Sequence, residues 1–101
     1  MNKKLESESV DQLFEGILAL RTREECYAFF EDICTANELV SIAQRFAVAR
    51  MLFENMTYTR ISEATGASTA TISRVNRALS FGSDGYSMIL SRLAEEKKQE
   101  D

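Results

Sequence analysis

The chain has 101 residues, of which 45% are hydrophobic and 28% charged, as in a typical folded domain. It holds no histidine and only two cysteines, which excludes zinc-finger ligand sets and histidine-based catalysis, so we expect neither a metal site nor an enzyme. The net charge of −4 is uneven: residues 41–80 hold five arginines against two glutamates, whereas both flanking blocks are acidic. A basic middle block is compatible with DNA binding despite the acidic total.

The ends of the chain carry no apolar segment long enough to cross a membrane or to act as a signal peptide. We therefore expect a cytoplasmic protein with no membrane partner. Residues 1–8 are predicted to be a mobile leader and residues 98–101 a mobile tail, with a single helical domain over residues 9–97. Cys26 and Cys34 lie eight positions apart on the expected helix, too far for a disulfide, and are predicted to be reduced core thiols.

Apolar side chains recur at helical spacing along nearly the whole chain, which also lacks proline, so the sequence predicts an all-α fold of six helices. The stripe of the first helix consists of Val10, Leu13, Phe14, Ile17 and Leu18. The second and third helices are each preceded by a capping box, in which a threonine and a glutamate three positions later satisfy free amides reciprocally. These boxes are Thr22–Glu25 and Thr35–Glu38.

The third predicted helix, over residues 37–55, is unusually apolar, because 11 of the 15 residues from Leu39 to Phe53 are apolar. Such a helix requires burial on nearly every side, which few helices of so small a monomer can obtain. We therefore expect a second copy of the chain to cover part of it, in a homodimer. The alternative is a central helix wrapped by its own neighbours.

Residues 58–79 fit a helix-turn-helix. Gly66 can adopt the positive φ of the corner, and Ala64 allows the two backbones to approach. The apolar anchors that would dock both helices on the core are Ile61, Ile72, Val75 and Leu79. A plain helical hairpin that only packs is the alternative, but the run Ser68–Arg74 has small polar side chains in place of the Glu and Lys of a merely solvated helix.

The exposed face of this segment is predicted to contact DNA. Ser68 is the expected N-cap of the second helix, whose short side chains let the backbone approach base edges while its arginines reach guanine or phosphate. Thr59 and Arg60 on the preceding helix would hold the DNA backbone. The complete predicted set is Thr59, Arg60, Ser68, Thr69, Ala70, Thr71, Ser73, Arg74 and Arg77. A helical protein-interaction module without DNA contact remains the alternative, motivated by the acidic pI of about 4.9.

The last helix is predicted to follow the turn-rich residues 80–85, with Ser83 or Asp84 as its cap. Its apolar stripe consists of Tyr86, Ile89, Leu90 and Leu93. Beyond Leu93 the chain has mixed charges, which favours a solvated and fraying end.

Residues 66–79, together with Thr35–Glu38 and Arg45, resemble the Trp repressor superfamily, and within it the bacterial Trp-repressor-like YerC/YecD branch. The resemblance covers about residues 8–93. It implies six helices in an intertwined homodimer. It also implies a transcriptional regulator, of repressor type, that inserts paired recognition helices into successive major grooves of a two-fold operator.

The same resemblance implies a candidate ligand pocket. In the Trp repressor, tryptophan lies between two arginines that match Arg45 and Arg74, near a threonine that matches Thr35. Val75 and Ala78, however, stand where that protein has a glycine that gives the indole room and a pocket serine, and the helix after Arg45 is one residue shorter. We therefore expect no tryptophan corepressor and no other cofactor, while an unidentified small-molecule effector stays open.

Both arginines of this candidate pocket have an alternative role. Arg74 can reach DNA bases instead of a ligand, as arginines at this place of a helix-turn-helix do. Arg45 can pair with a carboxylate such as Glu38, or extend its guanidinium to water from an apolar helix. The sequence leaves both alternatives open.

Overall fold

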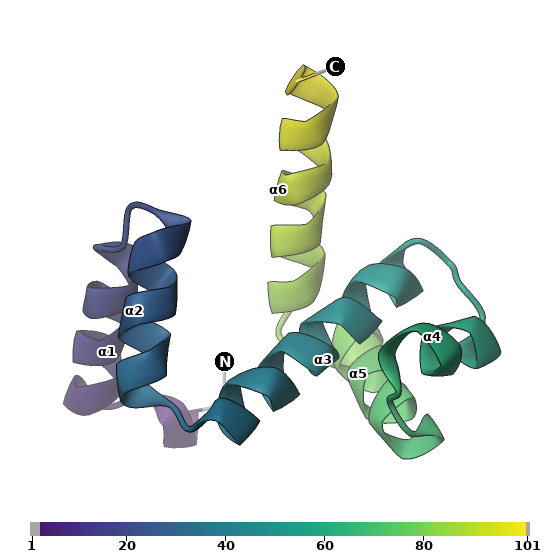
Figure 1. The fold of residues 1–101 in the computed structure, drawn as a ribbon, viewed down its shortest axis with the longest axis horizontal. Helices are drawn as coiled ribbons and strands as arrows, with labels where there is room; N and C mark the ends of the chain where they lie inside the picture. Colours follow the sequence, from purple (N-terminus) through teal and green to yellow (C-terminus); the bar gives the residue numbers. More distant parts are fainter. Residues whose placement is uncertain (1–2, 101) are drawn as a thin grey trace. The chain divides into compact units, whose positions relative to one another are not determined.

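The computed structural model describes residues 3–100, which form six α-helices and one short 3-10 helix, with no strand in that range (Figure 1). The elements are η1 (Lys3–Leu5), α1 (Glu8–Leu18), α2 (Arg23–Ile33), α3 (Ala36–Phe53), α4 (Tyr58–Thr65), α5 (Thr69–Phe81) and α6 (Gly85–Glu100). The predicted all-α fold and its six helices are confirmed. None of these helices is long and apolar enough to cross a membrane.

The described chain divides into two compact units, with the boundary between Leu39 and Val40 inside α3. The first unit holds η1, α1, α2 and the start of α3, and the second holds the rest of α3 with α4, α5 and α6. The single domain expected over residues 9–97 stays a prediction, and each unit is described separately below.

Side chains cap both helices of the first unit, and α2 begins directly after its predicted cap, Thr22. Ser7 Oγ accepts the Val10 amide at the start of α1. At the start of α2, Thr22 Oγ1 accepts the Glu25 amide at 3.1 Å, and the Glu25 carboxylate accepts the amide of Arg21 at 2.8 Å. The predicted capping box is therefore present, although its glutamate reaches one residue further back than expected.

The capping box before α3 is complete. Thr35 Oγ1 accepts the Glu38 amide at 3.1 Å, and the Glu38 carboxylate accepts the Thr35 amide at 2.8 Å. The hydrogen bond from the Thr35 amide, and after it one with the Thr35 side chain, lower the pKa of Glu38 below its ordinary value, because they favour the ionised carboxylate. The helix accordingly starts at Ala36, one residue earlier than predicted, and ends at Phe53.

No residue of α1 or α2 is fully buried within one chain. Along the predicted α1 stripe, Val10, Leu13 and Ile17 are half-buried, whereas Phe14 and Leu18 are exposed. The two cysteines are free thiols as expected, but the prediction that both lie in the core is wrong: Cys26 is exposed and Cys34 half-buried. The reason is that Cys26 belongs to a helix without a buried position.

The second unit has a wholly apolar core within the described residues, and α5 lies at its centre because it contacts both α4 and α6. The buried side chains are Val48 and Ala49 of α3, Ile61 of α4, Ala67 of the α4–α5 turn, Ile72 and Val75 of α5, and Leu90 of α6. Leu79 packs against this cluster and is half-buried. The anchors expected to dock residues 58–79 on the core therefore do so.

The mobility predicted for the leader and the tail stays a prediction, and residues 1, 2 and 101 lie outside the described range. Lys3–Leu5 form a 3-10 turn and α1 already begins at Glu8. At the other end α6 continues through Glu100, past the end of its apolar stripe. Residues 94–100 are alanine, glutamate, lysine and glutamine, all strong helix formers, so propensity extends the helix where packing has ended.

The start of α6 also takes an unexpected form. Asp84, one of the two expected caps, precedes the helix with a positive φ of 64°, and its carbonyl oxygen accepts the Met88 amide. An aspartate tolerates this left-handed conformation better than most residues. Asp84 therefore joins the start of α6 through its backbone carbonyl, which accepts a hydrogen bond from the helix.

Candidate nucleic-acid interface

The α4–α5 pair is built from two short, individually capped helices. Thr57 Oγ1 accepts the Arg60 amide at the start of α4, at 3.3 Å. Ser68 Oγ accepts the Thr71 amide at the start of α5, at 3.1 Å, and the same oxygen lies 3.1 Å from the Thr71 hydroxyl, to which it donates. The prediction that Ser68 is the N-cap of this helix is confirmed.

The corner between the helices is held by local hydrogen bonds. Gly66 has φ +73°, as predicted, and its amide donates to the Ser62 carbonyl at 2.8 Å. The Thr65 hydroxyl donates to the Ile61 carbonyl at 2.7 Å and accepts the Ala67 amide at 3.1 Å. The Ser62 hydroxyl donates to the Ala67 carbonyl at 3.0 Å. The path of the turn is thus fixed by side chains of α4 as well as by the glycine.

Gln44 of α3 ties this corner to the rest of the second unit. Its Nε2 donates to the Thr65 carbonyl at 3.2 Å, in a part-buried contact across 21 positions of sequence. The Thr65 carbonyl belongs to the last turn of α4, where carbonyl groups lack a partner within the helix. Sequence reasoning missed this role, although Gln44 is the one amide side chain between Leu39 and Phe53 of this largely apolar helix, which was a usable signal.

We expect Gly66→Ala to lower the free energy of unfolding by about 1–2 kcal/mol, because a Cβ penalises the left-handed backbone. An added Cβ would meet no atom within 4 Å, so the cost comes from the backbone alone. Gly66→Asn should lose less, since asparagine tolerates this region. Urea unfolding of the wild type and of both variants measures these differences in the free energy of unfolding.

Gly16→Ala is the matched control for that prediction. Gly16 lies inside α1 with open space around its Cα, so alanine should raise stability there, by about 0.5–1 kcal/mol. Equal losses at Gly16 and Gly66 would show that the sign of φ does not decide the outcome.

We further expect Gln44→Leu or Gln44→Glu to lower the free energy of unfolding by about 1–2 kcal/mol, because neither side chain can donate to the Thr65 carbonyl. Ser41→Ala, an exposed change on the same helix, is the control and should have little effect. Chemical unfolding followed by circular dichroism compares them. Wild-type stability in both Gln44 variants would contradict the anchoring role.

The predicted contact residues lie on the face of the pair turned away from the core. All of them are exposed except Thr71, which is half-buried with its hydroxyl engaged by Ser68. The exposed ones are Thr59, Arg60, Ser68, Thr69, Ala70, Ser73, Arg74 and Arg77. Neither helix has an acidic residue in its first turn, so the positive ends of both helix dipoles are left uncompensated there.

A shallow hollow of about 340 Å³ lies between α4 and the start of α5. It is lined by Tyr58, Thr59, Ser62 and Glu63 of α4 and by Thr69 of α5. Two of these, Thr59 and Thr69, are predicted contact residues. The others show that the hollow is lined with hydroxyl groups and one carboxylate.

The residues of the candidate ligand pocket belong to different units. Thr35 lies in the first unit, where it caps α3, whereas Arg45 and Arg74 lie exposed on α3 and α5 of the second. Glu38, considered as a partner for Arg45, uses a carboxylate oxygen to accept the Thr35 amide. Val75 is 2% exposed and belongs to the core, so its side chain faces Ile61 and its neighbours rather than open space.

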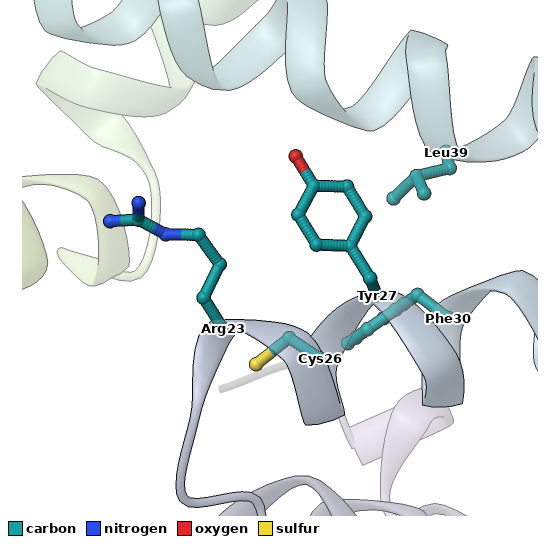
Figure 2. Close-up of a pocket in the computed structure, with 5 residues that line it drawn as sticks. All are labelled: Arg23, Cys26, Tyr27, Phe30 and Leu39. Atoms are coloured by element: carbon teal, nitrogen blue, oxygen red, sulfur yellow. The ribbon is translucent and has the colours of Figure 1, made fainter.

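The first unit contains a separate small pocket of about 280 Å³ (Figure 2). It is lined by Arg23, Cys26, Tyr27 and Phe30 of α2 and by Leu39. Figure 2 shows Arg23 and Tyr27 projecting from the same side of α2. None of these residues was predicted to take part in a site.

Six helices without a strand over residues 3–100, and a tightly turned helix pair with a basic exposed face, define an all-α protein of Trp-repressor-like fold. The chain belongs to the family described as Trp repressor protein, which it matches over residues 8–94. The resemblance drawn from residues 66–79 and the upstream positions is therefore confirmed.

Three relatives support the assignment. The chain is 58% identical over 92 residues to YerC, an uncharacterized protein of Bacillus subtilis (strain 168), covering 91% of this chain and 88% of that one. The crystal structure of a TrpR-like protein from Eubacterium eligens ATCC 27750 superimposes with a TM-score of 0.89 at 57% identity, covering 92% and 96% of the two chains. A second crystal structure, of a protein from Staphylococcus aureus, superimposes with a TM-score of 0.88 at 52% identity. The match covers 91% of this chain and 92% of that one.

Proposed function

We propose that the chain is a sequence-specific, double-stranded DNA-binding transcriptional regulator of repressor type, in which α4 and α5 form the helix-turn-helix and α5 is the recognition helix. One observation carries this proposal. The apolar side of α5 is buried through Ile72 and Val75, while Thr69, Ser73 and Arg77 are exposed on the same helix. Membership of the Trp repressor family supports the same function.

The chemistry of this face suits DNA. Between Tyr58 and Phe81 the chain has three arginines, Arg60, Arg74 and Arg77, against Glu63. Arginine donates bidentate hydrogen bonds to phosphate and to guanine, and the short side chains at the start of α5 let its backbone approach the groove. The net charge of −4 is carried by other parts of the chain.

We further propose an intertwined homodimer. Large apolar side chains of both units are exposed in one chain, among them Leu18 at 84%, Phe81 at 86% and Val40 at 67%. So many large apolar side chains left exposed by one chain favour burial against a partner copy. Two copies would place two recognition helices about one helical turn of DNA apart, which a single chain cannot do. Sedimentation equilibrium should give twice 11.4 kDa, and a monomer at micromolar concentration would contradict the dimer.

Tryptophan is not proposed as a corepressor. Val75 fills the core where a glycine would leave room beside Arg74, and Ala78 lacks the hydroxyl of the pocket serine in the Trp repressor. Titration calorimetry of the chain with tryptophan should show no binding heat. Saturable binding that tightens DNA affinity would overturn this part of the proposal. The same titration with pooled metabolites tests for another effector.

Salt dependence distinguishes the proposed function from a protein-interaction module. Binding to DNA should weaken with salt along a log–log slope of about −0.9 for each neutralised phosphate, whereas an apolar protein interface should respond little. Fluorescence anisotropy with a labelled duplex measures the slope. The salt concentration is varied from about 50 to 300 mM, because salt screens charge interactions strongly in this range. The absence of any duplex binding at the lowest salt would refute DNA recognition.

A further inference from the structure

Glu63 is the acidic residue of the α4–α5 pair, and its position is not explained by the proposed function alone. It is exposed on α4 one helical turn after Thr59, and it lines the hollow together with Ser62 and Thr69. Residues four positions apart lie on the same helix face, so Glu63 shares the face of a predicted DNA contact and lies nearer the start of α5. A carboxylate is thus placed within an otherwise basic surface.

The carboxylate in the hollow determines which group of DNA can bind there. An ionised carboxylate only accepts hydrogen bonds, so Glu63 repels a phosphate and attracts an amino group. In the major groove, exocyclic amino groups are carried by cytosine at N4 and by adenine at N6. Adenine presents the acceptor N7 beside its amino group, which a carboxylate repels, whereas the edge of cytosine offers the donor alone.

We propose that Glu63 reads a cytosine, with its carboxylate accepting a hydrogen bond from the N4 amino group in the major groove. This inference rests on the proposed DNA-binding function. Thr59 and Thr69 line the same hollow as Glu63, and their hydroxyl groups would contact neighbouring phosphate or base atoms. Glu63 therefore fixes one C·G base pair in each half of a two-fold site, while the arginines supply affinity.

The structural alternative is that Glu63 only stabilises α5. The first turn of α5 contains no acidic residue, and a carboxylate near a helix N-terminus interacts favourably with the helix dipole. In that case substitution of Glu63 would lower the thermal midpoint and leave the base preference unchanged. The two roles thus predict different measurements.

The test is a selection from random duplexes with the full chain, carried out for wild type, Glu63→Gln, Glu63→Ala and the control Glu54→Gln. Glu54 is also exposed and follows α3, outside the α4–α5 pair. Glu63→Gln should lose about tenfold of the cytosine preference at one position per half-site and gain adenine there, because glutamine pairs with adenine N6 and N7. Glu63→Ala should lose the preference without replacing it.

The remaining outcomes decide between the explanations. Both Glu63 variants should bind non-specific DNA at least as tightly as wild type, since each removes a negative charge. Unchanged base preferences in both, with or without a lower thermal midpoint, would overturn the reading of cytosine and leave the proposed function intact. Failure of wild type to enrich any sequence would overturn the proposed function and this inference together.

Discussion

Ile72→Ala is expected to lower the free energy of unfolding by about 3–4 kcal/mol, within the range measured for fully buried isoleucine and leucine side chains. Ile72 is 0% exposed, and it packs in the cluster that also contains Ile61 and Val48. Removing the side chain leaves a cavity and removes apolar contacts of α5, the helix that contacts both α4 and α6. Because small domains have little stability in reserve, this loss should be visible as a large fall in the thermal midpoint.

Ser73→Ala is the matched control for that substitution. Ser73 is the next residue of α5, exposed, and alanine is the stronger helix former, so stability should change by less than about 0.5 kcal/mol. Urea unfolding at several protein concentrations measures both variants and separates folding from association. Comparable stability for Ile72→Ala and Ser73→Ala would show that α5 does not dock through Ile72.

Arg77→Ala is expected to weaken DNA binding by about tenfold to a hundredfold at moderate salt without unfolding the chain. Arg77 is exposed on α5, so its side chain contributes charge to the face rather than packing to the core. In a dimer each copy loses its Arg77 contact, so each operator loses two contacts. If both are phosphate contacts, the magnitude of the log–log salt slope falls by about 2.

Arg50→Ala removes the same charge from the same unit and is the control. Arg50 lies exposed near the end of α3, beside Phe53 and Glu54 and outside the α4–α5 pair. Anisotropy titrations of both variants against one selected duplex give affinity and slope together. Equal losses for Arg50 and Arg77 would mean that overall charge, not the face of α5, governs binding.

Local sequence signals predicted the helix boundaries well, because capping depends on neighbouring residues. Thr22, Thr35 and Ser68 each cap the helix that follows them, and Gly66 adopts the positive φ of the turn. The apolar spacing of Ile61, Ile72 and Val75 also predicted which side of α4 and α5 is buried. These features require no knowledge of distant parts of the chain.

Features set by distant contacts were harder to predict. The bond from Gln44 to the Thr65 carbonyl joins residues 21 positions apart, and the sequence indicated only that Gln44 interrupts an apolar helix. Cys26 resembled a core residue because cysteine is commonly buried, yet it is exposed on a helix with no buried position. The place of Glu63 in the hollow was not predicted, because the sequence signals for DNA contact are basic and small side chains.

The central claim, that two copies of α5 read a two-fold DNA sequence, is tested most directly by selection of wild-type protein on random duplexes at moderate salt. The predicted result is an enriched sequence with two inverted half-sites, centred about 10 base pairs apart, and binding that Arg77→Ala weakens. Enrichment of no two-fold sequence, together with binding that Arg77→Ala leaves unchanged, would contradict it.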